Sequence, residues 1–443
     1  MVNEKIFINK DGTISTESIE YYNNIALYAK RYNLKNTIKS LDLAADLHNN
    51  TFRDGGSPYI IHPLETTNYL ILLNIRHTIF DMNLSNLHDE SLAEEQTNLD
   101  LDILLSSMLL HDTIEDCSSK LPERGEEFVT KYKLHPDILK FVLILTKDKT
   151  NPSFSLNTYF ENIGHYWQTL LMKLVDRINN CSTINCFSDA RMEKYVKETK
   201  NYFYTMASVL KNSFPEFSRQ ATILKYLFVS ICETVASSLG IQDIIVQESY
   251  DKSFYFIKGL SAGKGMSNTS KALPLAKEYY KGLTRKSGDA FIIHPLRVCS
   301  YLISLKIDDD IICAAALLHE IIKKCHLPYN GIEIVTKHNI NNSVLELIRL
   351  VSNSENYPLD LYYDSLKQNP KAMLLKLSNR AHTCTTLIDS SPDEFKSYVE
   401  ECEKYIYPLC EYGIKHYPKY AYSIQVMRYH ISSLCNIVKS LRG

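Results

Sequence analysis

The chain of 443 residues lacks the cysteine spacings that build small metal-bound or disulfide-bound domains, because none of its 11 cysteines forms a C-x-x-C pair. The sequence therefore indicates neither a zinc ribbon nor a disulfide framework. We expect reduced, mostly buried thiols, as is usual for a cytoplasmic protein. The chain also lacks a long basic stretch, and its formal net charge is only −2. This charge balance disfavours binding to nucleic acid, whose phosphate backbone attracts clustered lysine and arginine.

A long uninterrupted apolar segment is missing as well. The N-terminus (MVNEKIFINKDG) is polar, so we expect no signal peptide. The apolar stretch 223–241 contains Lys225 and Glu233, which indicates a buried helix rather than a membrane span, and we expect no membrane partner. Helical periodicity recurs along the chain, while strand-like alternation is confined to short pieces such as Lys5–Asn9. The prediction is an all-α protein long enough for two or three domains.

The residues that carry chemistry fall in four short pieces, in the order His62-Pro63, His111-Asp112, Glu115-Asp116 and Asp176-Arg177. Two histidines and two aspartates are a ligand set for one divalent metal. Imidazole nitrogen and carboxylate oxygen suit Mn²⁺, Fe²⁺ or Zn²⁺, and no thiolate is involved. A metal held this way lowers the pKa of a bound water and polarises a phosphoryl oxygen. A lone His-Asp pair would mean little, but the ordered combination predicts a metal site at His62, His111, Asp112 and Asp176.

A water-activating pair follows the second histidine. The stretch Leu101–Cys117 reads as one helix with a clear apolar face, and it places His111 and Glu115, and likewise Asp112 and Asp116, at i,i+4 spacing. Both acids can therefore lie on the side that carries the metal ligands. We predict that Glu115 or Asp116 orients the water or takes its proton, which is typically worth about 10²–10⁴-fold in rate.

Three segments resemble the signatures of one family, the RelA/SpoT hydrolase domain. The segment Arg53–Leu64 (RDGGSPYIIHPL) resembles its RxSGxPYIxHPL motif, and Leu109–Cys117 (LLHDTIEDC) resembles LLHDxxED. Lys173–Arg177 (KLVDR) with Asn180 is similar to KLxDRxxN. The resemblance covers residues ~41–190. It is more specific than general similarity to HD-type phosphohydrolases, because three motifs match in order.

The resemblance implies an all-helical domain that binds Mn²⁺ through the four predicted ligands, with Glu115 and Asp116 activating the water. The implied reaction removes the 3′-pyrophosphate from guanosine tetra- or pentaphosphate and gives GDP or GTP and pyrophosphate. Bifunctional members of the family also carry a synthetase domain. No synthetase-like strand pattern follows here, so the resemblance implies hydrolysis without synthesis.

Three substrate contacts carry over by position. Arg53 matches the signature arginine beside the base, and Asn180 matches the asparagine near the ribose. The loop 145–152 (LTKDKTNP) resembles a T-D-K-T-x-P loop of stand-alone alarmone hydrolases, which makes Lys149 a candidate phosphate contact. An exposed loop lysine explains Lys149 equally well. Asp54 departs from the family, which has a basic residue there, and this leaves the choice of base or phosphate open.

A second copy of the frame follows the first. Leu41–Leu64 aligns without a gap with Leu273–Leu296, 232 residues later, and both segments end in His-Pro-Leu. In the second copy the metal and acid positions have changed, as LLHEIIKK (317–324) and KLSNR (376–380) show. Asn379 removes an anionic ligand, and two lysines replace the acidic pair and cannot act as bases at neutral pH. We predict a pseudo-hydrolase of the same fold that is either a structural partner of the first domain or a binding site for an anionic nucleotide.

The first copy has extra length between its histidines, which maps to His77–Asp100, a polar and acidic surface excursion that could cover the pocket. We expect tandem HD-domain helical bundles, the first active and the second pseudo-enzymatic. The expected divisions are a hydrolase domain at 1–216, a helical connector with a Gly/Ser-rich loop (259–270) at 217–271, and the degenerate domain at 272–443.

Two rival functions remain open at this point. The first is an HD phosphohydrolase that acts on another nucleotide, such as ppApp, NADPH or a nucleoside phosphate. The second is a nucleotide-sensing or partner-binding protein, although a pure binding protein has no need of Glu115 and Asp116. The halves either dock within one chain or pair between the chains of a homo-oligomer.

Overall fold

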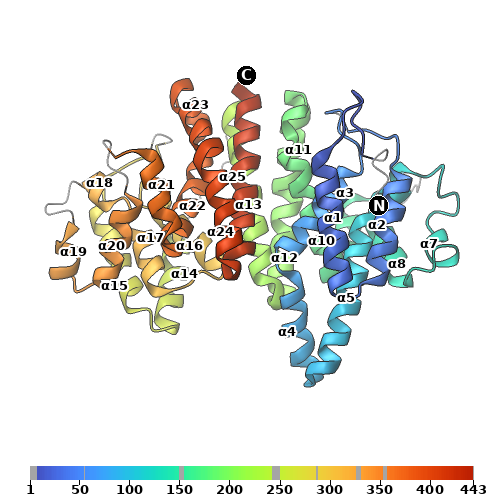
Figure 1. Ribbon diagram of the computed structural model, residues 1–443, viewed down its shortest axis with the longest axis horizontal. Helices are drawn as coiled ribbons and strands as arrows, with labels where there is room; N and C mark the ends of the chain where they lie inside the picture. Colours follow the sequence, from blue (N-terminus) through green and yellow to red (C-terminus); the bar gives the residue numbers. More distant parts are fainter. Residues whose placement is uncertain are drawn as a thin grey trace. The chain divides into compact units, whose positions relative to one another are not determined.

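The computed structural model describes residues 7–53, 55–148, 154–241, 250–285, 288–325, 331–352 and 357–442. In these ranges the regular structure is helical (Figure 1). Strand-like pairing there consists of the isolated bridges Ile8–Ile14, Phe52–Pro58 and Thr284–Ala290. The all-α prediction is confirmed. The chain divides into two compact units, Met1–Lys225 and Tyr226–Gly443.

The first unit is built from helices that surround α5. Its elements are α1 (Thr16–Arg31), α2 (Lys35–Leu47), α3 (Ile61–Leu72), α4 (Ile75–Leu87), α5 (Glu90–Leu110), α6 (Thr113–Asp116), α7 (Glu127–Thr130), α8 (Pro136–Leu145), α9 (Leu156–Gly164), α10 (Trp167–Ser182), the 3-10 turn η2 (Ile184–Cys186), α11 (Asp189–Glu198), the π turn η3 (Thr199–Phe203), α12 (Tyr204–Ser213) and the 3-10 turn η4 (Pro215–Phe217). The C-terminal half of α5 is buried from Leu101 to Leu110 and packs against α2, α3, α8 and α10.

The second unit repeats this order. Its elements are α14 (Tyr250–Gly263), α15 (Ser267–Tyr279), α16 (Ile293–Ser304), α17 (Asp310–Leu318), α18 (Ile321–Cys325), α19 (Glu333–Thr336), α20 (Asn342–Val351), α21 (Leu359–Lys367), α22 (Pro370–Cys384), η7 (Leu387–Asp389), α23 (Pro392–Glu401), η8 (Cys402–Ile406), α24 (Tyr407–His416), η9 (Pro418–Tyr420) and α25 (Ala421–Arg442). The helix α13 (Ser218–Leu239) crosses the division between the units.

The repeat extends to individual contacts. The carboxylate of Asp102 accepts hydrogen bonds from the backbone N–H groups of Asn36 (2.9 Å) and Thr37 (2.7 Å) and thereby caps the start of α2. In the second unit, Asp310 caps α15 through Asn268 and Thr269 at the same two distances. The internal repeat predicted from the sequence is therefore a repeat of the helical fold.

The predicted connector at 217–271 needs correction. Residues 259–270, expected to be a loop, lie in the end of α14, a three-residue turn and the start of α15. The Gly/Ser-rich composition predicted a loop wrongly, because these small residues allow close packing of helices. Ser261 is 1% exposed, and its hydroxyl oxygen accepts a hydrogen bond from the Ser270 hydroxyl (3.1 Å). The division between the units falls inside α13, earlier than the middle of the expected connector.

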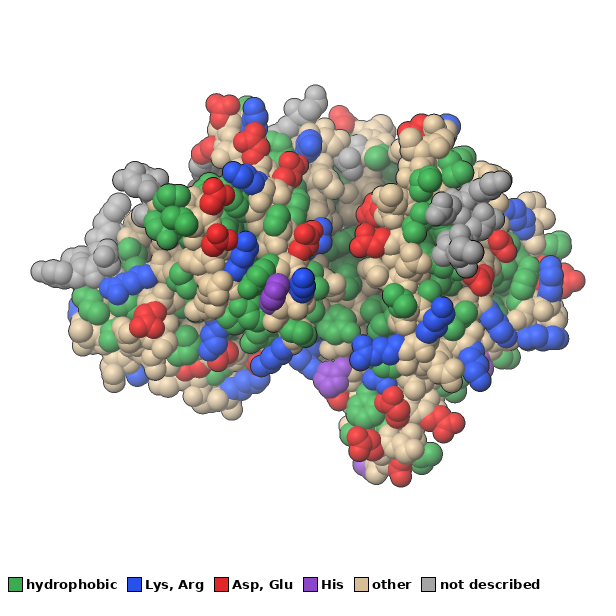
Figure 2. Space-filling model, viewed as in Figure 1, with side chains coloured by type: hydrophobic (Ala, Val, Ile, Leu, Met, Phe, Trp, Pro, Cys, Tyr) green, Lys and Arg blue, Asp and Glu red, His purple; other side chains and the backbone are tan. Residues whose placement is uncertain are grey.

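The excursion at 77–100 is also helical. It forms the end of α4 and the beginning of α5, a hairpin that is seen as the acidic projection at the bottom of Figure 2. Asp89 caps α5 by accepting a hydrogen bond from Leu92 N–H (3.0 Å). The tip of the hairpin lies at the opposite end of α5 from His111, about 30 Å away at 1.5 Å per helical residue. It therefore does not cover the predicted site.

One segment, Pro215–Leu239, is long and apolar enough to cross a membrane, with a mean hydropathy of 1.3. Of its most apolar window, 61% is buried inside the protein. A core helix gives the same result, so this segment on its own does not indicate a membrane protein.

Candidate metal centre

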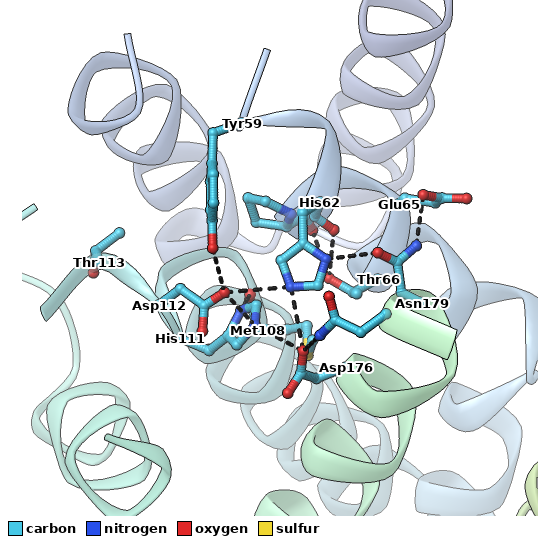
Figure 3. A network of polar contacts seen from close by, with 12 residues as sticks. Tyr59, His62, Glu65, Thr66, Met108, His111, Asp112, Thr113, Asp176 and Asn179 are labelled. Atoms are coloured by element: carbon cyan, nitrogen blue, oxygen red, sulfur yellow. Dashed lines mark hydrogen bonds and ion pairs between the residues drawn. The ribbon is translucent and has the colours of Figure 1, made fainter. Parts of the chain in front are cut away.

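Three parts of the first unit bring the four predicted ligands together (Figure 3). His62 lies in the first turn of α3, and Asp176 lies in the middle of α10. His111 and Asp112 occupy the corner between α5 and α6. Both histidines are only 2% exposed. The packing of α3, α5 and α10 against one another thus assembles side chains that are more than 100 residues apart in the sequence.

The expected single helix over Leu101–Cys117 is wrong at this corner. The helix α5 ends at Leu110, and α6 is a separate turn. Two side chains take carbonyl oxygens of the last turn of α5: His111 Nδ1 donates to Met108 (2.8 Å), and Thr113 Oγ1 donates to Leu110 (2.6 Å). The break allows the two consecutive residues His111 and Asp112 to face the same point, which consecutive residues of a straight helix do not do.

The ligand atoms converge closely. His62 Nε2 lies 3.3 Å from Asp112 Oδ2 and 3.3 Å from Asp176 Oδ1. His111 Nε2 lies 3.2 Å from Asp112 Oδ2 and 3.8 Å from Asp176 Oδ1. One ligand atom from each of His62, His111 and Asp176 lies within 4.8 Å of the others. Among the residues that the structure describes, the second unit has no comparable group.

The hydrogen bonds of the two imidazoles leave Nε2 available as a ligand. His62 Nδ1 lies 2.6 Å from Oδ1 of Asn179, while Asn179 Nδ2 donates to Glu65 Oε2. Since the amide nitrogen faces Glu65, its oxygen faces His62, and His62 Nδ1 carries the proton. His111 Nδ1 donates to a carbonyl oxygen, so Nε2 is the nitrogen that remains for a metal ion.

A cation fits the site because one of its polar atoms is buried without a hydrogen bond. His111 Nε2 forms no hydrogen bond of good geometry, although carboxylate oxygens of Asp112 and Asp176 lie 3.2 Å and 3.8 Å away and buried polar groups almost always form one. Burial by itself lowers the pKa of His111, but the carboxylates of Asp112 and Asp176 outweigh it and raise the pKa to about 10. The negative field that holds a proton on a buried imidazole would equally attract a divalent cation.

Asp176 is oriented by two further side chains. Its Oδ2 pairs with Lys173 Nζ at 2.8 Å, and its Oδ1 accepts a hydrogen bond from Asn180 Nδ2 at 2.6 Å. Arg53 donates to the amide oxygens of Asn179 (3.1 Å) and Asn180 (3.0 Å). The structure therefore brings Arg53 and Asn180, two of the three predicted substrate contacts, directly beside the ligand cluster.

The two predicted catalytic acids have different surroundings. Glu115 Oε1 accepts a hydrogen bond from the backbone N–H of Lys147 (2.6 Å), which anchors the segment after α8. Asp116 lies near the Tyr59 hydroxyl, and this hydroxyl also donates to Asp112 (3.1 Å). Burial raises the pKa of both acids, and the negative charge of Asp112 adds to the increase. Lys149, the third predicted substrate contact, and Asp54 lie outside the described residues.

Several residues of the site were not singled out from the sequence. Lys173 was noted only as part of a motif. Asn179 stands directly before the predicted Asn180, and Glu65 follows His62 by one helical turn, so i+3 spacing from each ligand is the signal that would have found both. The role of Tyr59 depends on the turn before α3 and has no such signal.

The second unit preserves the frame but changes its contacts. His294 Nε2 lies 3.2 Å from His319 Nε2, and His294 Nδ1 lies 2.8 Å from Nδ1 of His382, which replaces Asn179. Glu320 Oε1, in the place of Asp112, is 3.9 Å from His319 Nε2. Burial lowers the pKa of His294 and of His382 well below the usual range. The charge of His319 lowers the pKa of His294 further, and the charge of Arg285 lowers the pKa of His382 further.

Fold and site together define an all-helical protein whose first unit carries a two-histidine, two-aspartate centre suited to a divalent metal. Comparison with known proteins narrows this class. No family model matches the chain, and no solved structure matches it. Curated relatives do match, and they confirm the resemblance to RelA/SpoT-type hydrolases.

Three of these relatives show the extent of the similarity. The bifunctional (p)ppGpp synthase/hydrolase SpoT of Escherichia coli is 29% identical over 160 residues, which is 33% of this chain and 22% of that protein. A guanosine-3′,5′-bis(diphosphate) 3′-pyrophosphohydrolase of Borreliella burgdorferi is 24% identical over 191 residues, or 41% of this chain and 24% of the relative. A putative chloroplastic GTP diphosphokinase of Arabidopsis thaliana is 29% identical over 204 residues, which is 42% of this chain and 23% of the relative. The chain thus spans less than a quarter of the length of these relatives.

Proposed function

We propose that this protein is a metal-dependent alarmone hydrolase that removes the 3′-pyrophosphate of guanosine tetra- or pentaphosphate and releases pyrophosphate and GDP or GTP. The observation that carries the proposal is the convergence of His62, His111, Asp112 and Asp176 on one point beside Asp116. The names of the relatives support the same reaction, since several are guanosine-3′,5′-bis(diphosphate) 3′-pyrophosphohydrolases.

The residues of the chain have separate tasks in this proposal. The four ligands hold a divalent ion, which when bound polarises a phosphoryl oxygen and makes water a better nucleophile. Asp116 is the proton acceptor for the attacking water, because it stands beside Tyr59 and Asp112 and no backbone N–H group of the described residues holds it. Glu115 positions the segment after α8 through Lys147. Arg53 and Asn180 orient the nucleotide next to the reacting phosphorus.

We further propose Mn²⁺ as the resident ion and the cytoplasm as the compartment. Two imidazole nitrogens and two carboxylate oxygens without a thiolate suit Mn²⁺, although Fe²⁺ and Zn²⁺ accept the same donors. All 11 cysteines are free thiols, which fits a reducing compartment. Hydrolysis without synthesis stays a prediction.

A substrate panel tests the proposal. Purified full-length protein is incubated with Mn²⁺ and, separately, with ppGpp, ppApp, NADPH and GTP, and the products are identified by ion-exchange chromatography. We expect GDP and pyrophosphate from ppGpp, and no reaction in the Asp112→Ala variant. Release of inorganic phosphate alone, or a reaction with NADPH but not with ppGpp, would overturn the alarmone assignment. Inertness toward every compound would favour a nucleotide sensor.

A further inference from the structure

The acidic positions around the first site become basic or neutral in the second unit. The structural repeat places Arg297 where Glu65 stands, Lys323 and Lys324 where Glu115 and Asp116 stand, and Asn379 where Asp176 stands. Glu320 remains as the acid in the place of Asp112. Since the second unit repeats the helices of the first, this change reverses the sign of the charges at the place that corresponds to the first site.

The guanidinium of the first site is retained at this place. Arg285 stands where Arg53 stands, and its Nη2 donates to Thr386 Oγ1 (2.8 Å) while its Nη1 lies 3.4 Å from His382 Nδ1. Among the described contacts of Arg285 there is no ion pair with a carboxylate. The nearby Arg297 differs, because it pairs with Glu233 at 3.6 Å. Arg285 is influenced by the charges of Asp289 and Asp389 but forms no direct ion pair with either among the described contacts.

Besides burial, the charges of Lys324 and Arg285 both lower the pKa of His294, so both cations lie near this imidazole. Lys324 Nζ lies 5.5 Å from the ring centroid of Phe291, which replaces Tyr59, so Lys324 takes up the position of Asp116. Lys376, the counterpart of Lys173, lies within the electrostatic reach of Lys323 and pairs with Glu401 at 3.7 Å. Glu401 is shared, because it also pairs with Arg380 at 2.8 Å. The carboxylates near these cations are Glu320 and Glu401 beside Lys376, and Asp289 and Asp389 near Arg285. Among the described residues, Lys323 and Lys324 form no ion pair with a carboxylate.

The crowding of like charges disfavours the cationic forms. Burial lowers the pKa of Arg285 to about 10, and the charge of Arg297 contributes to the decrease. Burial also lowers the pKa of Lys376, where Arg380 and Lys323 act against Glu401. A bound anion would relieve this repulsion, and Arg and Lys together suit a phosphate group, the first as a planar fork and the second as a point charge.

We propose that the second unit binds a pyrophosphate group between Arg285, Lys323, Lys324 and Lys376, without a metal and without cleaving it. The anion comes either from free pyrophosphate or from the pyrophosphoryl end of a nucleotide. Cleavage does not follow because no carboxylate stands at the positions of Asp116 and Asp176. The proposed site uses other residues than the hydrolase site, so either proposal can be wrong without affecting the other.

Equilibrium dialysis of the full-length protein against labelled pyrophosphate, with EDTA present, tests the proposal. The Arg53→Gln background weakens anion binding in the first unit. We expect one pyrophosphate per chain and at least about tenfold weaker binding after Lys323→Glu/Lys324→Asp, which restores the acids of the first unit. The matched control is Lys396→Glu/Lys415→Glu, which removes the same charge from exposed positions of the second unit and should not change the affinity.

Competition separates the two sources of the anion. Unlabelled ppGpp that displaces pyrophosphate more effectively than pyrophosphate itself identifies the nucleotide, and weaker displacement identifies the free anion. Thermal unfolding of each variant establishes that it is folded, and Arg285→Gln, which adds no charge, provides an independent variant that should also bind more weakly. Equal affinity in the parent and in both site variants, or no binding to the parent, would overturn the proposal.

Discussion

The Nδ1 atom of His62 lies 2.6 Å from Oδ1 of Asn179, and the amide of Asn179 is itself held by Glu65. This chain of two hydrogen bonds fixes a proton of His62 on Nδ1 and directs its Nε2 atom toward the carboxylates of Asp112 and Asp176. The second unit has Arg297 and His382 in place of Glu65 and Asn179, so it lacks this arrangement.

Glu65 should therefore affect metal binding without touching the metal. We expect Glu65→Leu to weaken Mn²⁺ binding about 10–100-fold, as is typical for groups that orient a ligand. Glu65→Gln is the control, because its side-chain oxygen can still accept the hydrogen bond from Asn179. Isothermal titration with Mn²⁺ measures both. If Glu65→Leu binds Mn²⁺ as tightly as Glu65→Gln, the orienting role is wrong.

The protein should hold one metal per chain, in the first unit. Asp112→Ala and Asp176→Ala each remove an anionic ligand and should abolish both the bound Mn²⁺ and the turnover of ppGpp. His319→Ala in the second unit should leave the metal content at one per chain. Elemental analysis of dialysed protein gives these ratios, and exposed Glu161→Ala serves as the control. Loss of the bound metal in the His319→Ala variant would show that the ion lies in the second unit.

The roles of Asp116 and Glu115 should be separable by mutation. Asp116→Asn keeps the size of the side chain but removes a proton acceptor, so we expect metal binding to remain and kcat to fall about 10²–10⁴-fold. Glu115→Gln can still accept the hydrogen bond from Lys147 N–H, so we expect a smaller loss that falls mainly on KM. Steady-state kinetics with ppGpp measures both effects. A larger fall of kcat in the Glu115 variant would reverse the two roles.

Gly125 should be important for stability, because it combines a left-handed backbone (φ +93°) with close neighbours. A Cβ atom there would lie 2.8 Å from Ile114 Cδ1 and 2.9 Å from Leu139 Cδ1. We expect Gly125→Ala to lower the free energy of unfolding by about 1–3 kcal/mol. Gly12 (φ +86°) has no atom within 4 Å of such a Cβ, so Gly12→Ala isolates the backbone strain and should cost less. Urea denaturation compares the two.

Acid should destabilise the second unit through His430. Burial lowers its pKa to about 3 in the folded protein, compared with about 6.5 in an unfolded chain. The unfolded state therefore binds more protons between these two values, and stability is complete above pH ~6.5 and falls as the pH decreases below it. The expected contribution is about 1.4 kcal/mol per pH unit. His430→Phe should remove this part of the slope in urea titrations between pH 7 and 5, and an unchanged slope would contradict the assignment.

Sequence alone determined the fold class of this protein and predicted the residues of the candidate site. Helical periodicity and three ordered motifs indicated the all-α fold, the four ligands and the repeat, because apolar spacing and ligand type are local properties of the chain. The prediction failed where packing outweighs composition. Residues 259–270 have the small side chains of a loop, yet Ser261 is buried in a helix.

Only the tertiary structure decided how the site is held. The helix that leads to His111 ends at Leu110, because two side chains form hydrogen bonds with carbonyl oxygens of its last turn. Glu65 and Asn179, 114 residues apart, meet because α3 packs on α10, and together they set the proton of His62. The sequence shows which charges changed between the two copies. Which of these charges lie near one another in the second unit depends on three-dimensional packing, since hydrogen bonds and charges act through distance in space.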